Sequence, residues 1–130
     1  MKYTVEIVDI DRLKQHEQIR KGHLNKLMKR IEADGHIKNP IIVDKNTMII
    51  LDGHHRYNAM KQLGLKSSPV CLCDYNDDAI TVSSWKKNKT ITKEDVVKAG
   101  ITGKLLTPKT SRHYIPERPV GLKVPLKKLR

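Results

Sequence analysis

Residues 48–64 read MIILDGHHRYNAMKQLG and combine a strand, a polar turn and a helix in one continuous run. The four apolar residues at its start predict a buried strand. Apolar and aromatic residues then recur at helical spacing, at Tyr57, Met60 and Leu63. Gly64 supplies a stop signal for this helix. We therefore expect residues 52–56 to form the junction at which the strand meets the N-terminus of the helix.

This junction predicts an anion site. A helix that starts here points unpaired backbone N–H groups and the positive end of its dipole at a ligand above the strand. Gly53 lets a ligand approach the backbone, and three neighbours add donors and positive charge: His54, His55 and Arg56. Phosphate is the expected occupant, and Asp52 is placed to hold a cation or to orient a neighbour. The alternative is a structural turn with Asp52 as the helix cap, but crowded cationic donors repel one another unless an anion relieves them.

Composition limits the class of protein without choosing a function. A chain of 130 residues fits one domain, and 38% hydrophobic content supports a modest core. The net charge of +12 suits a nucleotide, a nucleic acid or an anionic membrane. We find no signal peptide and no apolar run of membrane length, so a cytoplasmic protein without membrane partners is expected. The only cysteines, Cys71 and Cys73, are expected to be small buried residues rather than a metal pair or a disulfide.

The rest of the chain predicts a single α+β domain. Further strands are expected at residues 2–10, 41–43 and 70–73, and an amphipathic helix at residues 23–33. The strand at residues 41–43 should pair with the start of the central run as a hairpin.

The C-terminal part of the chain is harder to assign. Residues 80–85 fit either a strand or a short helix. Thr92 is the expected cap of a helix that closes at Gly100. Three further prolines predict an extended tail, at Pro116, Pro119 and Pro125.

Three separated segments resemble one known family. The Asp-Gly-His-His-Arg-Tyr sequence at residues 52–57 is similar to the signature of the ParB/sulfiredoxin-like superfamily, in the form found in its free serine kinases. The His16-Glu17 pair matches these kinases in order and position, and so does the Lys-Thr-Ser-Arg-His sequence at residues 109–113. The resemblance implies one ParB/sulfiredoxin-like domain over residues 1–130, with a small mixed sheet and helices packed around it. This chain departs from the archaeal serine kinases in one respect: the stretch between the Trp85 region and Lys109 is shorter than theirs.

The resemblance also implies an activity and a role for each site residue. The enzyme would transfer a phosphoryl group from a magnesium-bound nucleotide, ADP or ATP, to free L-serine and give O-phospho-L-serine. Glu17 would be the catalytic base, Asp52 would engage the Mg²⁺, and residues 53–56 would bind phosphates. The serine and its phosphate would contact Trp85, Lys109, Thr110, Ser111, Arg112 and His113. The chemistry of these side chains agrees with serine binding, because a small zwitterion with a hydroxyl needs a cation for its carboxylate and several polar partners.

The sequence is also compatible with other functions. The same fold serves DNA-binding and nucleotide-sensing proteins of the chromosome-partitioning type, and the positive charge is compatible with them. Those proteins carry Gly-Glu-Arg-Arg where this chain has residues 53–56, and no helix pair suited to a helix-turn-helix follows Gly64. Repair of oxidised cysteine, as in sulfiredoxins, requires a cysteine where this chain has His54. A ligand sensor without turnover would use nearly the same residues as the kinase, and the oligomeric state is open.

Overall fold

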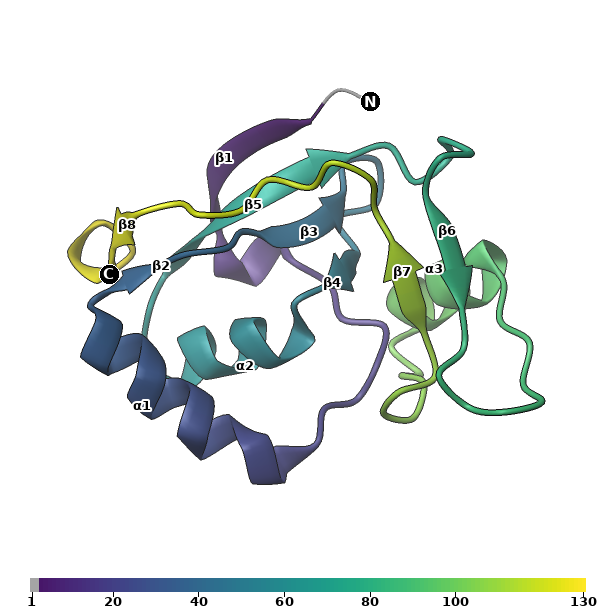
Figure 1. Cartoon of the computed structure of the whole chain (residues 1–130), viewed down its shortest axis with the longest axis horizontal. Helices are drawn as coiled ribbons and strands as arrows, with labels where there is room; N and C mark the ends of the chain where they lie inside the picture. The colour runs from purple at the N-terminus through teal and green to yellow at the C-terminus, as the bar shows by residue number, and fades with distance from the viewer. Residues whose placement is uncertain (1–2) are drawn as a thin grey trace.

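A computed structural model describes residues 3–130. Its centre is a four-stranded sheet in the order β1-β5-β3-β4 (Figure 1). The strands are β1 (Thr4–Asp9), β3 (Ile41–Asp44), β4 (Ile50–Asp52) and β5 (Ser67–Cys73). β5 is antiparallel to β1 and parallel to β3, and β3 and β4 form the predicted antiparallel hairpin. The mixed sheet confirms the α+β prediction; residue 2 of the first predicted strand lies outside the described residues.

Two helices cover one face of this sheet (Figure 1). α1 (Leu24–Asp34) agrees with the predicted amphipathic helix, and Gly35 ends it in a left-handed conformation with φ 72°. α2 (His54–Gln62) is the helix of the central run. Aliphatic residues of the sheet pack against both helices, and Ile41, Val43 and Ile50 are all 0% exposed. This packing fixes the junction between β4 and α2, because both of its flanks belong to the core.

A smaller unit packs at the other end of the sheet. It contains α3 (Lys93–Thr102) and the two-stranded ribbon of β6 (Thr81–Ser83) and β7 (Arg112–Tyr114). β6 settles the open assignment of residues 80–85 as a strand. Thr92 caps α3 as predicted, in a reciprocal capping box with Asp95.

The predicted end of α3 at Gly100 is wrong, because the helix continues to Thr102 and Gly103 caps it. Gly100 is a packing residue instead. An added Cβ there would lie 2.6 Å from Ile49 Cδ1, so α3 approaches the Ile49 side chain more closely than a larger residue allows.

The proline-containing segment after β7 is extended, as predicted, but its C-terminal end packs against the rest of the domain. Residues 115–123 cross the face of the sheet opposite α1 and α2 (Figure 1), and β8 (Val124–Pro125) then pairs with β2 (His36–Ile37). After the 3-10 turn η3 (Leu126–Lys128), the carbonyl of the fully buried Leu129 accepts hydrogen bonds from the backbone N–H groups of Lys66 and Ser67. Leu126 and Leu129 of the C-terminal segment are therefore part of the core.

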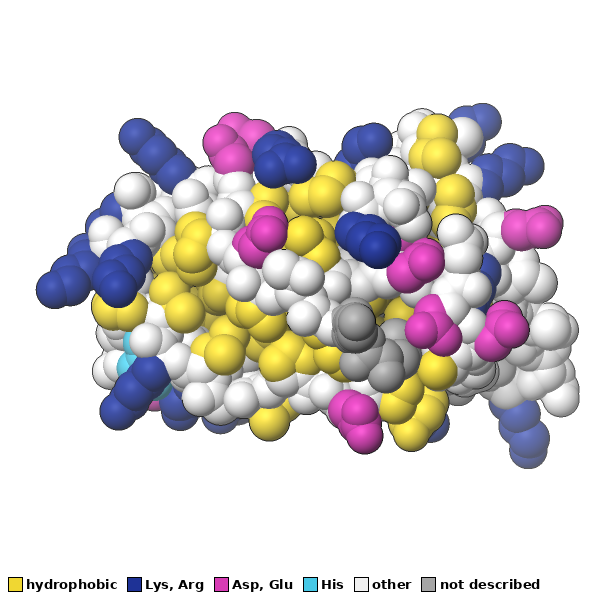
Figure 2. Space-filling view, turned by 90° about the horizontal axis from the view of Figure 1, so that it is seen from above, with side chains coloured by type: hydrophobic (Ala, Val, Ile, Leu, Met, Phe, Trp, Pro, Cys, Tyr) yellow, Lys and Arg dark blue, Asp and Glu magenta, His cyan; other side chains and the backbone are white. Residues whose placement is uncertain are grey.

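The surface crossed by this segment carries mixed charge. Figure 2 shows Lys and Arg side chains interspersed with Asp and Glu, and hydrophobic side chains exposed between them. The excess positive charge does not form a continuous basic stripe on this face. No helix within residues 3–130 is long and apolar enough to cross a membrane.

Cys71 and Cys73 are free and buried, as predicted. Burial raises the pKa of Cys71 to about 11 and that of Cys73 to about 12, so neither thiol ionises near neutral pH.

Candidate active site

The junction between β4 and α2 opens into a pocket of about 510 Å³. Segments far apart in the sequence meet there. They are the loop before α1, the junction itself, Trp85 just after β6 and the segment that leads into β7. The lining includes eleven predicted site residues: Glu17, Asp52, Gly53, His54, His55, Arg56, Trp85, Lys109, Ser111, Arg112 and His113. The loop before α1 contains two 3-10 turns, η1 (Ile10–Arg12) and η2 (Lys21–His23).

Gly53 is required at the junction for two physical reasons. Its φ of 108° lies in a region that residues with a side chain rarely adopt. An added Cβ would also lie 3.1 Å from Arg56 Nη2 and 3.4 Å from the Ile41 backbone. The glycine therefore lets Arg56 fold back over the turn, toward Asp52.

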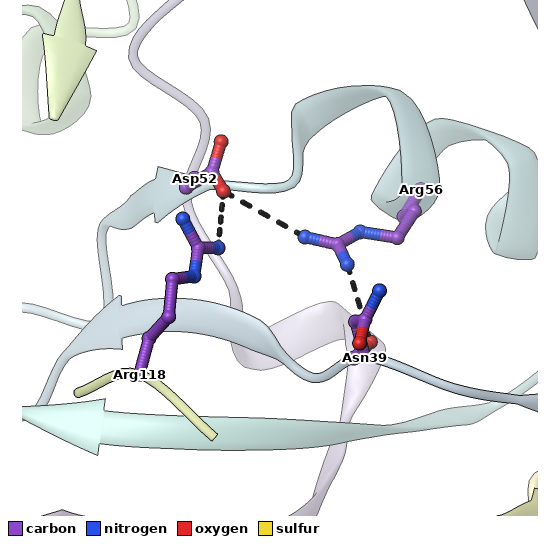
Figure 3. A network of polar contacts seen from close by, with 4 residues as sticks. All are labelled: Asn39, Asp52, Arg56 and Arg118. Carbon is purple, nitrogen blue, oxygen red and sulfur yellow. Dashed lines mark hydrogen bonds and ion pairs between the residues drawn. The ribbon is translucent and has the colours of Figure 1, made fainter. Parts of the chain in front are cut away.

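Asp52 is held by two arginines (Figure 3). Arg118 donates a hydrogen bond to Asp52 Oδ2, and Arg56 Nη2 lies 3.8 Å from the same oxygen. Burial alone would raise the pKa of Asp52, but the hydrogen bond and charge of Arg118, helped by Arg56, hold this pKa below its ordinary value. Asp52 is therefore an ionised carboxylate flanked by two cations.

The two signature histidines are acceptors in this structure. His54 Nε2 accepts the backbone N–H of His16, and His55 Nε2 accepts the backbone N–H of Arg20, both at 3.2 Å. Burial lowers the pKa of both imidazoles, and neighbouring histidines lower that of His54 further. The expectation that these side chains add positive charge needs correction: both are neutral and hold the loop before α1.

Glu17 lies in that loop and has a fixed orientation. Glu17 Oε1 accepts the backbone N–H of Ser111 at 2.7 Å and the Ser111 hydroxyl at 2.8 Å. The loop is anchored on both sides of Glu17, since Leu106 exchanges backbone hydrogen bonds of 2.8 Å with His16 and Gln18. The carboxylate is thus presented to the pocket by contacts that come from two distant parts of the chain.

The Lys-Thr-Ser-Arg-His segment contributes side chains of several kinds. The Arg112 guanidinium lies 4.3 Å from the centre of the Trp85 ring, and Trp85 is 57% exposed, so this tryptophan is not a core residue. His113 Nε2 is 2.7 Å from the Tyr75 hydroxyl, and burial lowers the pKa of His113 to about 3.

Thr110 is the predicted site residue that the structure does not bring into the pocket. It is 1% exposed, and its hydroxyl donates to the Thr107 carbonyl at 2.7 Å. Thr110 therefore supports the turn that presents its neighbours, and it does not line the site.

Residues absent from the sequence prediction also line the pocket, above all Arg118. Arg118 lies in the extended segment, between Pro116 and Pro119, and no local pattern distinguishes it from a solvated arginine. Arg20 and His23 are further additions, from the loop before α1.

The donor set for a metal ion is small. Within residues 3–130, no group of three or more His, Cys, Asp or Glu residues could hold a metal ion. Mg²⁺ at phosphoryl-transfer sites commonly uses one or two carboxylates together with phosphate oxygens. Asp52 fits Mg²⁺ in this way, as one protein ligand beside a bound nucleotide.

The fold and the pocket together define a class: a small α+β domain in which a strand–turn–helix junction and a fixed carboxylate line one pocket. Residues 2–89 match the ParB N-terminal domain, and the chain therefore belongs to that family.

Two relatives and one solved structure refine this assignment. A protein of Staphylothermus marinus named ATP-dependent L-serine kinase is 37% identical over 83 residues, which cover 61% of this chain and 33% of that protein. A protein of Sulfolobus acidocaldarius named ParB-like protein is 40% identical over 85 residues, 65% of this chain and 42% of that protein. The structure of a free serine kinase in complex with AMP has a TM-score of 0.90 at 18% identity and covers 97% of this chain and 93% of that one. The last likeness is one of fold, and the matched stretches span less than half of either relative.

Proposed function

We propose that this chain is a kinase that transfers a phosphoryl group from a nucleotide to the hydroxyl of free L-serine. The observation that carries the proposal is the fixed Glu17 carboxylate, which lines the same pocket as the phosphate-binding junction. Phosphoryl transfer needs positioning, charge stabilisation and a proton acceptor, and this pocket contains candidates for each. The serine kinase name of the Staphylothermus marinus relative supports serine as the acceptor.

The proposed step places Glu17 beside the serine hydroxyl. Glu17 takes the hydroxyl proton while the serine oxygen forms a bond to the terminal phosphorus of the nucleotide. The bond from that phosphorus to the leaving oxygen breaks, and its electron pair stays on the shortened nucleotide. The products are O-phospho-L-serine and a nucleotide with one phosphate fewer.

The phosphates would occupy the junction. The backbone N–H groups at the start of α2 and the guanidinium groups of Arg56 and Arg118 supply positive potential there. Asp52 would hold Mg²⁺, which would neutralise phosphate charge when the nucleotide is bound. His54 and His55 would act by fixing the loop of Glu17, through the acceptor bonds described above.

The acceptor amino acid would lie on the side of Glu17 that faces β7. Arg112, stacked on Trp85, and Lys109 would bind its carboxylate, since both are cations on the pocket lining. His113 would form part of the pocket wall, since its ring is held by the Tyr75 hydroxyl and by a hydrogen bond with the Leu51 backbone.

A second candidate is a nucleotide-binding regulatory protein without turnover. The Sulfolobus acidocaldarius relative named ParB-like protein and the net charge of +12 favour it. The mixed charge in Figure 2 argues against DNA binding through that face.

Phosphorus NMR of the protein with Mg²⁺, L-serine and either ADP or ATP tests both functions at once. A growing O-phosphoserine resonance is expected, and the productive nucleotide identifies the donor. Nucleotide binding with no phosphoserine would favour the regulatory protein and overturn the kinase. Removal of Mg²⁺ with EDTA is expected to abolish turnover, and turnover that persists would exclude the proposed role of Asp52.

A further inference from the structure

Ser111 has contacts that a role in binding the acceptor amino acid does not explain. Its backbone N–H and its hydroxyl both contact Glu17 Oε1, at 2.7 and 2.8 Å. The same hydroxyl oxygen lies 2.8 Å from His16 Nε2. Ser111 therefore stands between the candidate base and a histidine that is 0% exposed.

A count of protons shows that these contacts cannot all be satisfied together. The Ile50 carbonyl can only accept, so His16 Nδ1, 2.6 Å away, carries the imidazole hydrogen. A neutral imidazole has one N–H, which leaves Nε2 as an acceptor. An ionised Glu17 also only accepts. The single hydroxyl hydrogen of Ser111 thus faces two acceptors at equal distance and can serve only one of them at a time.

We infer that the Ser111 hydroxyl is a switch, which donates to Glu17 while that carboxylate is ionised and turns to His16 Nε2 once Glu17 has taken a proton. The origin of this proton rests on the proposed function: it leaves the serine hydroxyl as the oxygen–phosphorus bond forms. Ser111 and His16 keep their own protons throughout, so only the direction of one hydrogen bond changes.

The switch has a physical advantage for a base. A hydrogen bond to a carboxylate is stronger than one to a neutral acceptor, so Ser111 holds Glu17 in place before the reaction. When Glu17 becomes neutral this bond weakens, and a part-buried hydroxyl that loses its acceptor costs free energy. His16 Nε2 supplies the replacement acceptor and so offsets the cost of protonating Glu17.

The surroundings keep His16 in its neutral form. The ring of His54, from α2, lies 4.5 Å from the His16 ring, and that of His113, from β7, lies 5.7 Å away. His55, also on α2, interacts electrostatically with Glu17, and burial lowers the pKa of His55 as well. Burial lowers the pKa of His16 to about 4, and burial also lowers the pKa values of His54 and His113. His16 therefore remains an acceptor at Nε2 near neutral pH.

Imidazole ¹⁵N NMR of the ligand-free protein tests this inference. The His16 signals are identified by their loss in His16→Asn, and we expect the Nδ1-protonated tautomer. Glu17→Gln removes the charged acceptor, so the His16 Nε2 resonance should move to lower frequency as it gains the Ser111 hydrogen bond. In Ser111→Ala the Glu17→Gln change should leave this resonance in place, whereas Ser111→Thr, which keeps the hydroxyl, should preserve the response. An Nε2-protonated tautomer, or an equal response in Ser111→Ala, would overturn the switch.

Kinetics supply a second test. Ser111→Ala is expected to lower kcat roughly tenfold with little change in KM for serine, the loss of one hydrogen-bond contribution, and Ser111→Thr should restore most of the rate. A raised KM with unchanged kcat would instead make Ser111 a ligand of the acceptor amino acid and overturn the inference. The NMR test contains no substrate, so the expected ¹⁵N response in a protein that makes no phosphoserine would support the switch and contradict only the kinase.

Discussion

His54 Nε2 accepts the backbone N–H of His16 at 3.2 Å, and this hydrogen bond ties the signature turn to the loop that carries Glu17. His55 makes the equivalent bond to Arg20. The two histidines thus join the β4–α2 junction to the candidate base, although 38 residues separate His16 from His54 in the sequence. The site is assembled by neutral imidazoles that accept backbone hydrogen bonds.

The first prediction concerns these two bonds. His54→Ala should accelerate amide hydrogen exchange at His16 about fivefold, because one hydrogen bond contributes about 1 kcal/mol. His55→Ala should have the same effect at Arg20 and leave His16 unchanged, so each variant is the control for the other. Exchange followed by NMR measures both amides in one experiment. Unchanged exchange at both positions would contradict the anchoring role.

The second prediction concerns acid. His16 has a pKa of about 4 in the folded protein against 6.5 ordinarily, so the unfolded chain binds more protons between these values. The contribution of His16 to the free energy of unfolding is complete above pH 6.5. As the pH falls toward 4, this free energy decreases by roughly 3 kcal/mol. Urea unfolding across this range should show a smaller pH dependence in His16→Asn than in the parent. An equal slope for His16→Asn and the parent would contradict the lowered pKa of His16.

The third prediction uses the two roles of Asp52. Asp52→Asn removes the charge that occupies Arg56 and Arg118, so AMP without Mg²⁺ should bind about fivefold more tightly. The same variant should lose Mg²⁺-dependent turnover, because the proposed metal ligand is gone. Isothermal titration calorimetry gives the affinity. Asp34→Asn, whose carboxylate pairs with Lys38, is the control and should change neither quantity. Weaker AMP binding in Asp52→Asn would mean that Asp52 does not compete for the arginines.

The fourth prediction concerns packing. Helix propensity alone predicts that Gly100→Ala stabilises α3 by about 1 kcal/mol. The 2.6 Å approach to Ile49 Cδ1 predicts the opposite, a loss of about 1–3 kcal/mol from overpacking. Gly22→Ala is the matched control, because an added Cβ there would meet nothing within 4 Å. Thermal and urea unfolding of the three proteins decide the sign, and a stabilised Gly100→Ala would show that the contact relaxes freely.

Local sequence patterns account for much of this fold. The apolar start of residues 48–64 and its glycines predict the strand, turn and helix, since both elements bury one face in a shared core. The Thr92 cap is equally local. The end of α3 was predicted wrongly because Gly100 is needed for its contact with Ile49, which no local pattern contains.

The polar arrangement of the site depends on contacts between distant segments. Arg118 reaches Asp52 across 66 residues of sequence, and an arginine between prolines carries no local signal for that contact. The protonation state of His54 could not be predicted either. Its imidazole is neutral because it is buried and because its Nε2 accepts the backbone N–H of His16. Thr110 shows the converse: it belongs to a matching motif, yet its hydroxyl serves the Thr107 turn.

The central claim is that Glu17 accepts the proton of the serine hydroxyl, and the most direct test is the rate of O-phosphoserine formation by Glu17→Gln. The account predicts a loss of about 10²–10⁴-fold in kcat with nucleotide affinity nearly unchanged. Glu32→Gln, on α1, is the control and should retain the parent rate. Parent-level turnover by Glu17→Gln, or a loss explained entirely by weakened nucleotide binding, would contradict the account.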